Sequence, residues 1–463
     1  MDYYGHPRVD RIGEPENTMS GKKTSTAKQM VVGLGATGLS IARYLQRSDI
    51  DAMFFDSRDE PPGLEELDEI SPGAKVLLGG SKLPRSVQRI IASPGVADSH
   101  PLLVKARKKN IEVVSDIELF ARDASVPFVA VTGSNGKSTV TTLLYHMCRA
   151  DGREVLAGGN LGEPALDLLD QDNPDVYVLE LSSFQLQRTQ KLPAQIAVLL
   201  NVSPDHLDWH TDEDEYRQSK YRVYRDAKAA VCNRADEETP KYTKHCERVV
   251  SFGSDAPEDG HYGLRTDGEE TYLACGETLL LSTGDLGMYG MHNQLNALAA
   301  LAVGDLLGLD MAAMLQVLVE FPGLPHRMQF VARIAAVDYI NDSKATNVAA
   351  AVASIESIDT MLVLVAGGDG KGGDFGDLSA AVEDKLRGAV LIGKDAEKIA
   401  HALDTVMPVH FADTMGAAVS MAAKCAESDD TVLLAPACAS LDQYNNYMER
   451  GDSFCDAVEA LKR

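Results

Sequence analysis

Positive charge is scarce in this sequence. Its 463 residues include 44 lysines and arginines against 69 aspartates and glutamates, which gives a formal net charge of −25. Proteins that bind nucleic acids or anionic membranes in general rely on broad basic surfaces. We therefore expect neither partner, and any phosphate-binding site must be made locally by a few residues.

Cysteine pairs and long apolar runs are also missing. The seven cysteines form no C-x-x-C pair and no zinc-like spacing, which indicates a reducing compartment and predicts a cytoplasmic protein. No apolar run approaches the roughly 20 residues that a membrane helix needs. Residues 1–27 are polar and lack the apolar core of a signal peptide, so we expect a disordered lead-in there.

The length of the chain predicts several domains. Because a typical domain has roughly 100 to 200 residues, we expect about three. From Gln29 onward, short apolar runs alternate with amphipathic stretches, a pattern typical of parallel strands covered by helices. The expected α/β domains span residues 28–122, 123–325 and 326–463, with the second seam at the proline-rich FPGLPHR. The runs expected to form strands are QMVVG, AMFFD, RIIAS, PFVAVTG, VYVLEL, IAVLLN, AVDYIND, TMLVLVAGG, GAVLIG and TVLLAP.

Two glycine clusters predict phosphate-binding sites. In the first, Gly33, Gly35 and Gly38 form G-x-G-x-x-G between an apolar strand and a helix, and Asp56 ends the next strand. Such glycines let backbone N–H groups approach a diphosphate, and the acid can accept a bond from a ribose hydroxyl. We interpret the cluster as a nucleotide or dinucleotide site. A turn without a ligand is the alternative, and nothing local separates NAD from another diphosphate.

The second cluster, TGSNGKST, follows the strand PFVAV and opens a helix. Its glycines free the backbone to wrap phosphates, Lys137 supplies a positive charge, and Ser138 can place a hydroxyl on Mg²⁺. Val131 stands where the standard G-x-x-x-x-G-K-[ST] loop has its first glycine, so the motif is a variant. We predict an ATP site at the loop residues Gly133, Ser134, Asn135, Gly136, Lys137, Ser138 and Thr139.

Acidic and histidine side chains follow two later strands. Glu180 lies at the end of VYVLEL, where a carboxylate can ligate Mg²⁺, although a structural acid explains it equally well. Asp205, His206, Asp208 and His210 follow IAVLLN, again at a carboxyl end of a strand where ligands gather. We interpret this cluster as a metal or catalytic site, with structural histidine as the alternative.

In their order along the chain, these motifs resemble those of the Mur ligase family from about Lys28 to the C-terminus. The resemblance implies an N-terminal Rossmann-like domain, a central P-loop NTPase-like domain with a mostly parallel sheet, and a C-terminal Rossmann-like domain. The motifs that carry it are GLGATG, SPG at residues 93–95, TGSNGKST, NLG, LELSSFQL, NVSPDHLDWH, YRQSKYRVY, GMHNQLNALAA, GLPHR, INDSKATN, GGDGKGGDF and APACASLDQY.

The resemblance turns the first glycine cluster into a cradle for the UDP part of UDP-N-acetylmuramoyl-L-alanine, in place of an NAD site. The residues that it implies for this substrate are Gly35, Ala36, Thr37, Asp56, Ser57, Arg58, Gly95 and Asn160.

The resemblance also implies two Mg²⁺ ions and a modified lysine. By itself, Lys220 in DEDEYRQSKYRVYRDAK reads as one cation on the solvated face of a helix of mixed charge. In the family the matching lysine reacts with CO₂ to N6-carboxylysine, an anion that binds Mg²⁺, and only the deprotonated amine can react. The implied metal ligands are Ser138, Glu180, His206 and Lys220 as the carbamate.

Later segments complete the implied ATP site. Asn293 and Asn296 match residues near the adenine, although asparagines at a helix start often act as caps. Arg327, Asp342 and Lys344 match contacts to the ATP ribose and phosphates, where surface ion pairs would be the ordinary interpretation. The implied catalytic residues are Lys137, His206, Lys220 and Lys344.

The last domain would hold D-glutamate, which has two carboxylates. Thr346 and Lys371 would receive one, and Ser440 with the backbone near Leu441 and Tyr447 would receive the other. GGDGKGGDF is not read as a third phosphate loop, because no serine or threonine follows its lysine.

The implied activity is an ATP-driven amide ligation of cytoplasmic peptidoglycan precursor synthesis. It adds D-glutamate to UDP-N-acetylmuramoyl-L-alanine through an acyl phosphate, and we expect the enzyme to act as a monomer. Folylpolyglutamate synthase would lack the first domain, and a ligase that adds diaminopimelate would carry D-N-P-R, of which DNPD at residues 172–175 is a chance near miss. An NAD-dependent oxidoreductase leaves TGSNGKST unused, and a regulatory ATP-binding module leaves the D-glutamate residues unexplained.

Overall fold

The computed structural model describes residues 28–160, 162–172, 174–203, 209–403 and 407–462. The expected lead-in, residues 1–27, lies outside the described residues, as do Asp205, His206 and Asp208 of the predicted metal cluster. None of the helices in these described ranges has both the length and the apolar character needed to span a bilayer.

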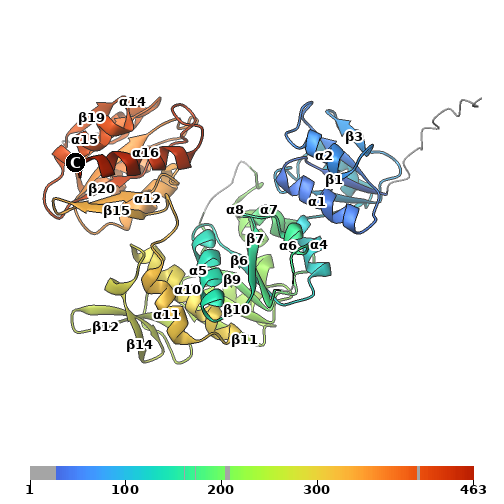
Figure 1. Cartoon of the computed structure of the whole chain (residues 1–463), viewed down its shortest axis with the longest axis horizontal. Coiled ribbons are helices and arrows are strands. Elements are labelled where there is room, and N and C mark those ends of the chain that lie inside the picture. The colour runs from blue at the N-terminus through green and yellow to red at the C-terminus, as the bar shows by residue number, and fades with distance from the viewer. Residues whose placement is uncertain (1–27, 161, 173, 204–208, 404–406, 463) are drawn as a thin grey trace, which may run out of the picture.

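Three sheets follow one another along the chain, and Figure 1 shows the N-terminal and C-terminal units on either side of the central one. The first sheet is parallel throughout, with the order β3-β2-β1-β4-β5. The first strand, β1, lies in the middle of the sheet; β2 and β3 follow on one side of it, and β4 and β5 on the other. The direction in which strands are added therefore reverses between β1 and β4, and such folds bind nucleotides at that point. Its strands are β1 (Gln29–Val32), β2 (Ala52–Asp56), β3 (Lys75–Leu78), β4 (Arg89–Ala92) and β5 (Glu112–Val114).

The central sheet has the order β14-β13-β12-β11-β10-β9-β6-β8-β7. It is parallel from β7 to β12 and ends in antiparallel strands, β12 to β14. Its strands are β6 (Phe128–Thr132), β7 (Val155–Gly159), β8 (Val176–Glu180), β9 (Ile196–Leu199), β10 (Ala229–Asn233), β11 (Arg248–Phe252), β12 (Tyr262–Asp267), β13 (Glu270–Cys275) and β14 (Thr278–Ser282).

The C-terminal sheet has the order β15-β16-β20-β17-β18-β19 and is parallel except at its edge strand β15. Its strands are β15 (Gln329–Ile334), β16 (Val337–Asn341), β17 (Leu362–Gly367), β18 (Leu386–Ile392), β19 (Val409–Ala412) and β20 (Thr431–Leu434).

Helices cover the three sheets (Figure 1). Those of the first unit and the seam after it are α1 (Ala36–Arg47), α2 (Leu64–Ile70), α3 (Pro101–Lys108) and α4 (Asp116–Asp123). Those of the central unit are α5 (Lys137–Ala150), α6 (Ala165–Leu168), α7 (Ser183–Gln187), α8 (Glu213–Tyr221), η1 (Arg222–Tyr224), α9 (Thr239–Tyr242), η2 (Thr283–Asp285), α10 (Met291–Leu307) and α11 (Met311–Glu320). Those of the last unit are α12 (Val348–Glu356), α13 (Gly376–Val382), α14 (Ala396–Leu403), α15 (Met415–Cys425) and α16 (Tyr447–Ala460).

The predicted α/β class with three units is confirmed, and every apolar run expected to form a strand does so. All residues of β6, β8 and β9 are buried, because helices cover both faces of a parallel sheet and leave no solvated side. The strands that the sequence did not reveal include β3, a short edge strand with partly exposed residues.

The first two units share a continuous apolar core. The ring of Phe120 in α4 meets those of Phe128 in β6 and Tyr177 in β8 edge to face, with centroids 5.7 and 5.1 Å apart. The same cluster includes Val31 of β1. Packing of this kind fixes the N-terminal unit on the central one and brings their strand ends together.

Candidate nucleotide and substrate sites

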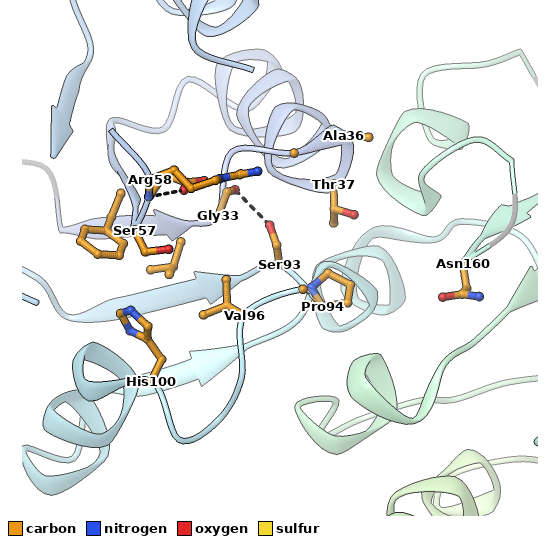
Figure 2. A pocket seen from close by; sticks show the side chains of 15 residues that line it. Gly33, Ala36, Thr37, Ser57, Arg58, Ser93, Pro94, Val96, His100 and Asn160 are labelled. Carbon is orange, nitrogen blue, oxygen red and sulfur yellow. Dashed lines mark hydrogen bonds and ion pairs between the residues drawn. The ribbon is translucent and has the colours of Figure 1, made fainter. Parts of the chain in front are cut away.

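A pocket of about 590 Å³ lies at the carboxyl ends of β1, β2 and β4 (Figure 2). In Figure 2, Asn160 faces the pocket from the end of β7 in the central unit, apart from the other labelled residues. The structure thus brings together every residue predicted to contact the UDP substrate: Gly35, Ala36, Thr37, Asp56, Ser57, Arg58, Gly95 and Asn160.

The three glycines of the first cluster are required for different physical reasons. Gly33 has φ of +98°, and a Cβ there would lie 3.0 Å from the Cβ of Ser93. At Gly38 a Cβ would lie 1.9 Å from the carbonyl oxygen of Gly33, so this glycine permits the helix to pack on the turn. A Cβ at Gly35 would meet no atom of the described residues within 4 Å, which leaves room for a ligand close to the backbone.

Replacement of Gly35 by alanine should therefore affect ligand binding, whereas replacement of Gly38 should affect stability. Gly35→Ala is expected to fold normally and to weaken UDP binding about tenfold or more, which is about 1.4 kcal/mol, because the methyl group occupies ligand space. Gly38→Ala should lower the free energy of unfolding by about 1–3 kcal/mol or more, because the added methyl group overpacks the turn. Thermal unfolding and calorimetric titration with UDP measure the two effects. Normal UDP binding by Gly35→Ala would contradict this assignment.

The carboxylate of Asp56 is held at the pocket by hydrogen bonds from Leu34 and Arg58. It accepts bonds from the backbone N–H of Leu34 at 2.8 Å and from the backbone and guanidinium of Arg58 at 2.8 to 3.0 Å. Burial opposes its ionisation, but the bonds from Arg58 and Leu34 outweigh burial and lower the pKa of Asp56 to about 2. Among the described residues that line the pocket, Arg58 is the one lysine or arginine, so it supplies the local positive charge that this acidic chain otherwise lacks.

Sequence reasoning did not single out the rings of Phe55 and His100, which also line the pocket. They meet edge to face with centroids 5.6 Å apart, and burial lowers the pKa of His100. His100 caps α3, accepting a bond from the N–H of Leu102 at 3.2 Å. No local sequence signal marks either residue, because the pocket joins segments that are distant in the chain.

The second glycine cluster forms the predicted loop between β6 and the N-terminus of α5. Gly136 has φ of +83°, and the N–H of Asn135 donates to the side chain of Asn201 at 2.9 Å. The Nζ atom of Lys137 donates to the carbonyl oxygens of Gly133 and Ser134, both at 2.8 Å. The loop therefore presents a helix N-terminus and a lysine to one place, an arrangement suited to a phosphate.

Lys220 lies beside this loop and not on a solvated face. It is 2% exposed, its Nζ atom donates to the carbonyl oxygen of Gly133 at 2.7 Å, and it lies 4.7 Å from the ring centroid of Tyr216. The solvated-face interpretation of this lysine is wrong, because α8 packs with this side toward the glycine loop.

Glu180 has the properties of a cation ligand. The residue is 2% exposed, and its Oε1 atom accepts a bond from the side-chain amide of Asn160 at 2.7 Å. Its Oε2 atom is buried and has no hydrogen-bond partner among the described residues. A buried carboxylate oxygen without a donor is costly unless a cation satisfies it, so this atom fits a metal ion.

The other predicted metal ligands are only partly described. The hydroxyl oxygen of Ser138 accepts a bond from Arg327 at 3.2 Å. Within the described ranges no three His, Cys, Asp or Glu residues are grouped as a metal site would need. His206 lies outside those ranges.

Asn293 and Asn296 are buried in the first turns of α10, whose N-cap is Gly290. The interpretation of these asparagines as helix caps is therefore wrong. The side-chain amide of Asn296 donates to Asn293 at 3.1 Å, and a Cβ at Gly136 would lie 2.3 Å from the Oδ1 atom of Asn296. Asn296 thus lies directly against the phosphate loop, and Asn293 holds its side chain.

Three predicted ATP contacts come from the C-terminal unit. Arg327 reaches Ser138 of the central unit, as described above. Asp342 is buried, which raises its pKa, and it accepts bonds from Ser354 and from the N–H of Met328. Lys344 lies 4.2 Å from the ring centroid of Tyr447. Burial and the charge of Arg327 lower the pKa of Lys344, and Glu180 opposes them.

The residues predicted to hold the acceptor lie on neighbouring loops of the same unit. The backbones of Asp369 and Ala439 exchange two hydrogen bonds of 2.9 Å, which joins the loop of Lys371 to that of Ser440. Ser440 is buried, and Leu441 is 66% exposed. Tyr447 begins α16, and the N–H of Thr346 donates to the carbonyl oxygen of Lys344 at 2.8 Å.

Three family models match the chain. They are the MurD-like N-terminal domain of Mur ligases at residues 27–115, the Mur ligase middle domain at residues 131–304, and the glutamate ligase domain of Mur ligases at residues 326–438. Each of the three matched ranges contains most of the strands of one of the three sheets.

Curated relatives and solved structures extend the similarity over most of the chain. The UDP-N-acetylmuramoylalanine–D-glutamate ligase of Legionella pneumophila is 45% identical over 93% of this chain and 99% of its own length. That of Nitrosococcus oceani is 46% identical over 94% and 97%. The MurF ligase of Thermotoga maritima in complex with ADP shares the fold, with a TM-score of 0.60, 18% identity, and coverage of 94% and 99%. The chain therefore belongs to the Mur ligase family.

Proposed function

We propose that this chain is an ATP-dependent ligase that joins D-glutamate to UDP-N-acetylmuramoyl-L-alanine, in the cytoplasmic synthesis of peptidoglycan precursors. The observation that carries the proposal is the link between two nucleotide sites: Asn160 lines the first pocket and donates to Glu180 beside the second. The names of the relatives at 45% and 46% identity support the choice of substrates.

In this proposal each unit has one ligand. The N-terminal unit binds the UDP part of the substrate, with its diphosphate at the N–H groups of residues 35–37 and beside Arg58. The central unit binds ATP at residues 133–139, with Asn293 and Asn296 toward the adenine. The C-terminal unit binds D-glutamate through Thr346, Lys371, Ser440, Leu441 and Tyr447, and the enzyme acts as a monomer.

The chemistry begins with activation of a carboxylate, because a carboxylate is a poor acylating agent. The γ-phosphoryl group of ATP moves to an oxygen of the alanyl carboxylate, which gives an acyl phosphate and ADP. The amine of D-glutamate then attacks the carbonyl carbon, the phosphate leaves, and the nitrogen loses a proton as the amide forms. Lys137 and Lys344 offset the negative charge of the transferring group.

Two Mg²⁺ ions fit the donors of this site. The unpartnered Oε2 atom of Glu180 and the hydroxyl of Ser138 are oxygen ligands of the kind that Mg²⁺ prefers. We propose that Ser138, Glu180, His206 and a carbamate on Lys220 hold the ions. When bound, Mg²⁺ neutralises the phosphate charge and orients the groups in line.

Closure of the C-terminal unit should complete the ATP site. Arg327 already contacts Ser138, whereas Asp342 accepts hydrogen bonds within its own unit and Lys344 lies over the ring of Tyr447. Bound ATP would offer its ribose and phosphates as shared partners for these groups, so that substrate binding favours the closed arrangement.

Phosphate release tests the proposal directly. The purified chain is incubated with ATP, Mg²⁺ and UDP-N-acetylmuramoyl-L-alanine while the acceptor is varied among D-glutamate, L-glutamate and meso-diaminopimelate. Phosphate should be released only with D-glutamate, together with a product whose mass equals the two substrates joined with loss of water. Equal rates with L-glutamate would refute the proposed acceptor. A reaction that does not need the UDP substrate would refute the ligation itself.

A further inference from the structure

Arg188 is a buried cation that the proposed chemistry does not use. It lies in the central unit directly after α7, in the segment of residues 180–188 that follows β8 and starts at Glu180. Its side chain is 2% exposed. A guanidinium so deeply buried is costly unless its N–H groups find acceptors. Burial lowers the pKa of Arg188, and the charge of Asp98 opposes this effect.

Among the described residues, the acceptors of this guanidinium all lie in the N-terminal unit. Its Nε atom donates to the carboxylate of Asp98 at 2.7 Å, and one terminal nitrogen donates to the carbonyl oxygen of Ser93 at 3.0 Å. The other terminal nitrogen donates to the carbonyl oxygen of Val96. One central side chain thus holds three points of residues 93–98.

The loop that Arg188 holds is a wall of the UDP pocket. Residues 93–96 all line the pocket, and Figure 2 shows Ser93, Pro94 and Val96 beside the glycine turn. The hydroxyl of Ser93 donates to the carbonyl oxygen of Gly33 at 3.0 Å, and the N–H of Val96 closes a turn onto Ser93 at 3.1 Å. Any shift of the loop would therefore move both the wall and the turn that approaches the diphosphate.

Other contacts hold the two units together without Arg188. The side-chain amide of Gln185 donates to Asp116 at 3.1 Å, and the hydroxyls of Ser115 and Thr189 lie 2.8 Å apart. The apolar core around Phe120 also spans the seam. Loss of Arg188 should therefore release the pocket loop and leave the units docked.

We propose that Arg188 is a positioning residue for the UDP-bearing substrate. It does not touch the substrate; it fixes residues 93–98 against the glycine turn and ties the pocket to the segment of Glu180. This inference rests on the proposed function of the pocket as the UDP site. The strength of binding in the N-terminal unit thereby depends on a side chain of the ATP-binding unit.

Calorimetric titration with UDP and, separately, with ADP tests this role. Arg188→Ala should raise the Kd for UDP about 10- to 100-fold, the range expected when hydrogen bonds to a charged group are lost. Its Kd for ADP should stay within twofold of the wild type. In turnover, KM for the UDP substrate should rise by a similar factor while kcat changes less than about threefold.

Three further variants sharpen the test. Arg225→Ala is the matched control, because this arginine of the same unit donates to the carbonyl oxygen of Gln190 and not to the pocket loop. Its UDP affinity should equal that of the wild type. Arg188→Lys should give an intermediate Kd for UDP, since one ammonium cannot reach three diverging acceptors. Should Arg188→Ala fail to fold, Asp98→Asn, which removes one acceptor charge, is expected to weaken UDP binding about threefold or more.

The outcomes separate this inference from the proposed function. A folded Arg188→Ala protein that binds UDP as the wild type does would overturn the positioning role. Equal losses of UDP and ADP affinity would also overturn it, because they indicate a general loosening of the fold. A wild-type protein without affinity for UDP would instead refute the pocket assignment, and the inference with it.

Discussion

Lys137→Ala should lower the rate of ADP formation about 10³-fold or more, the scale seen when a preorganised positive group is removed from a phosphoryl-transfer site. The reason is the position of this lysine at the first turn of α5, with its Nζ atom at the carbonyl oxygens of Gly133 and Ser134. In that place the ammonium can turn from backbone oxygens to the phosphates of ATP. Loss of the charge leaves the transferring group without its nearest fixed cation.

The loop itself should survive this change. Its shape depends on the positive φ of Gly136 and on the paired bonds between Asn135 and Asn201, none of which involves the ammonium. Lys137→Ala should therefore unfold close to the wild-type temperature and bind UDP normally. Arg149→Ala is the matched control, since this exposed arginine lies in the last turn of the same helix and pairs with Glu154. Undiminished ADP formation by a folded Lys137→Ala protein would refute the ATP site.

Local sequence patterns predicted the buried strands and the glycine loops, because each of these features depends on a short stretch of chain. Strands such as β6 and β8 are continuous apolar runs, and helices cover both their faces. The glycine loops were predictable because backbone geometry demands glycine there: Gly136 is left-handed, and Gly38 admits no Cβ. The local pattern marked Gly35 and Asp56 of the UDP pocket, and the family resemblance added Ala36, Thr37, Ser57, Arg58, Gly95 and Asn160, all of which line the same pocket.

Side chains whose surroundings arise from distant segments were not predictable in this way. Lys220 lies in a run of mixed charge that suggests solvent exposure, yet packing of α8 on the glycine loop buries it. Arg188 gives no local signal, because its acceptors lie about 90 positions earlier in the chain. Periodicity reports on one element at a time and cannot show which polar residue another element will cover.

The antiparallel extension of the central sheet was missed although the sequence carries a sign of it. Strands β12 and β13 pair directly across Asp267 and Glu270, and Gly268 between them has φ of +63°. The two-residue loop between them is Gly268-Glu269, and glycine first in a two-residue loop between strand-like runs is typical of a hairpin turn. The runs themselves contain few consecutive apolar residues, which is why a search for buried parallel strands passes over them.

If Lys220 holds a metal ion as proposed, Lys220→Ala should lower kcat about 10²- to 10³-fold, the loss expected when a group that holds a charge-stabilising ion is removed. Lys220 is buried against Gly133, so its replacement acts at the phosphate loop and not at the surface. Lys241→Ala is the control. This lysine is 62% exposed and pairs with Glu238, and its loss should leave kcat unchanged.

A carbamate on Lys220, as we propose, would give a dependence on CO₂ that no ordinary lysine shows. The neutral amine adds to the carbon of CO₂ and loses a proton, which yields an anion; removal of CO₂ reverses the step. Activity of the wild type should therefore fall in buffer stripped of CO₂ and return when bicarbonate is added. Lys220→Glu carries a permanent carboxylate, so whatever activity it retains should not respond to bicarbonate. If CO₂ removal leaves the wild-type rate unchanged, Lys220 acts as an ammonium, and the second metal ion must be held by other oxygen ligands.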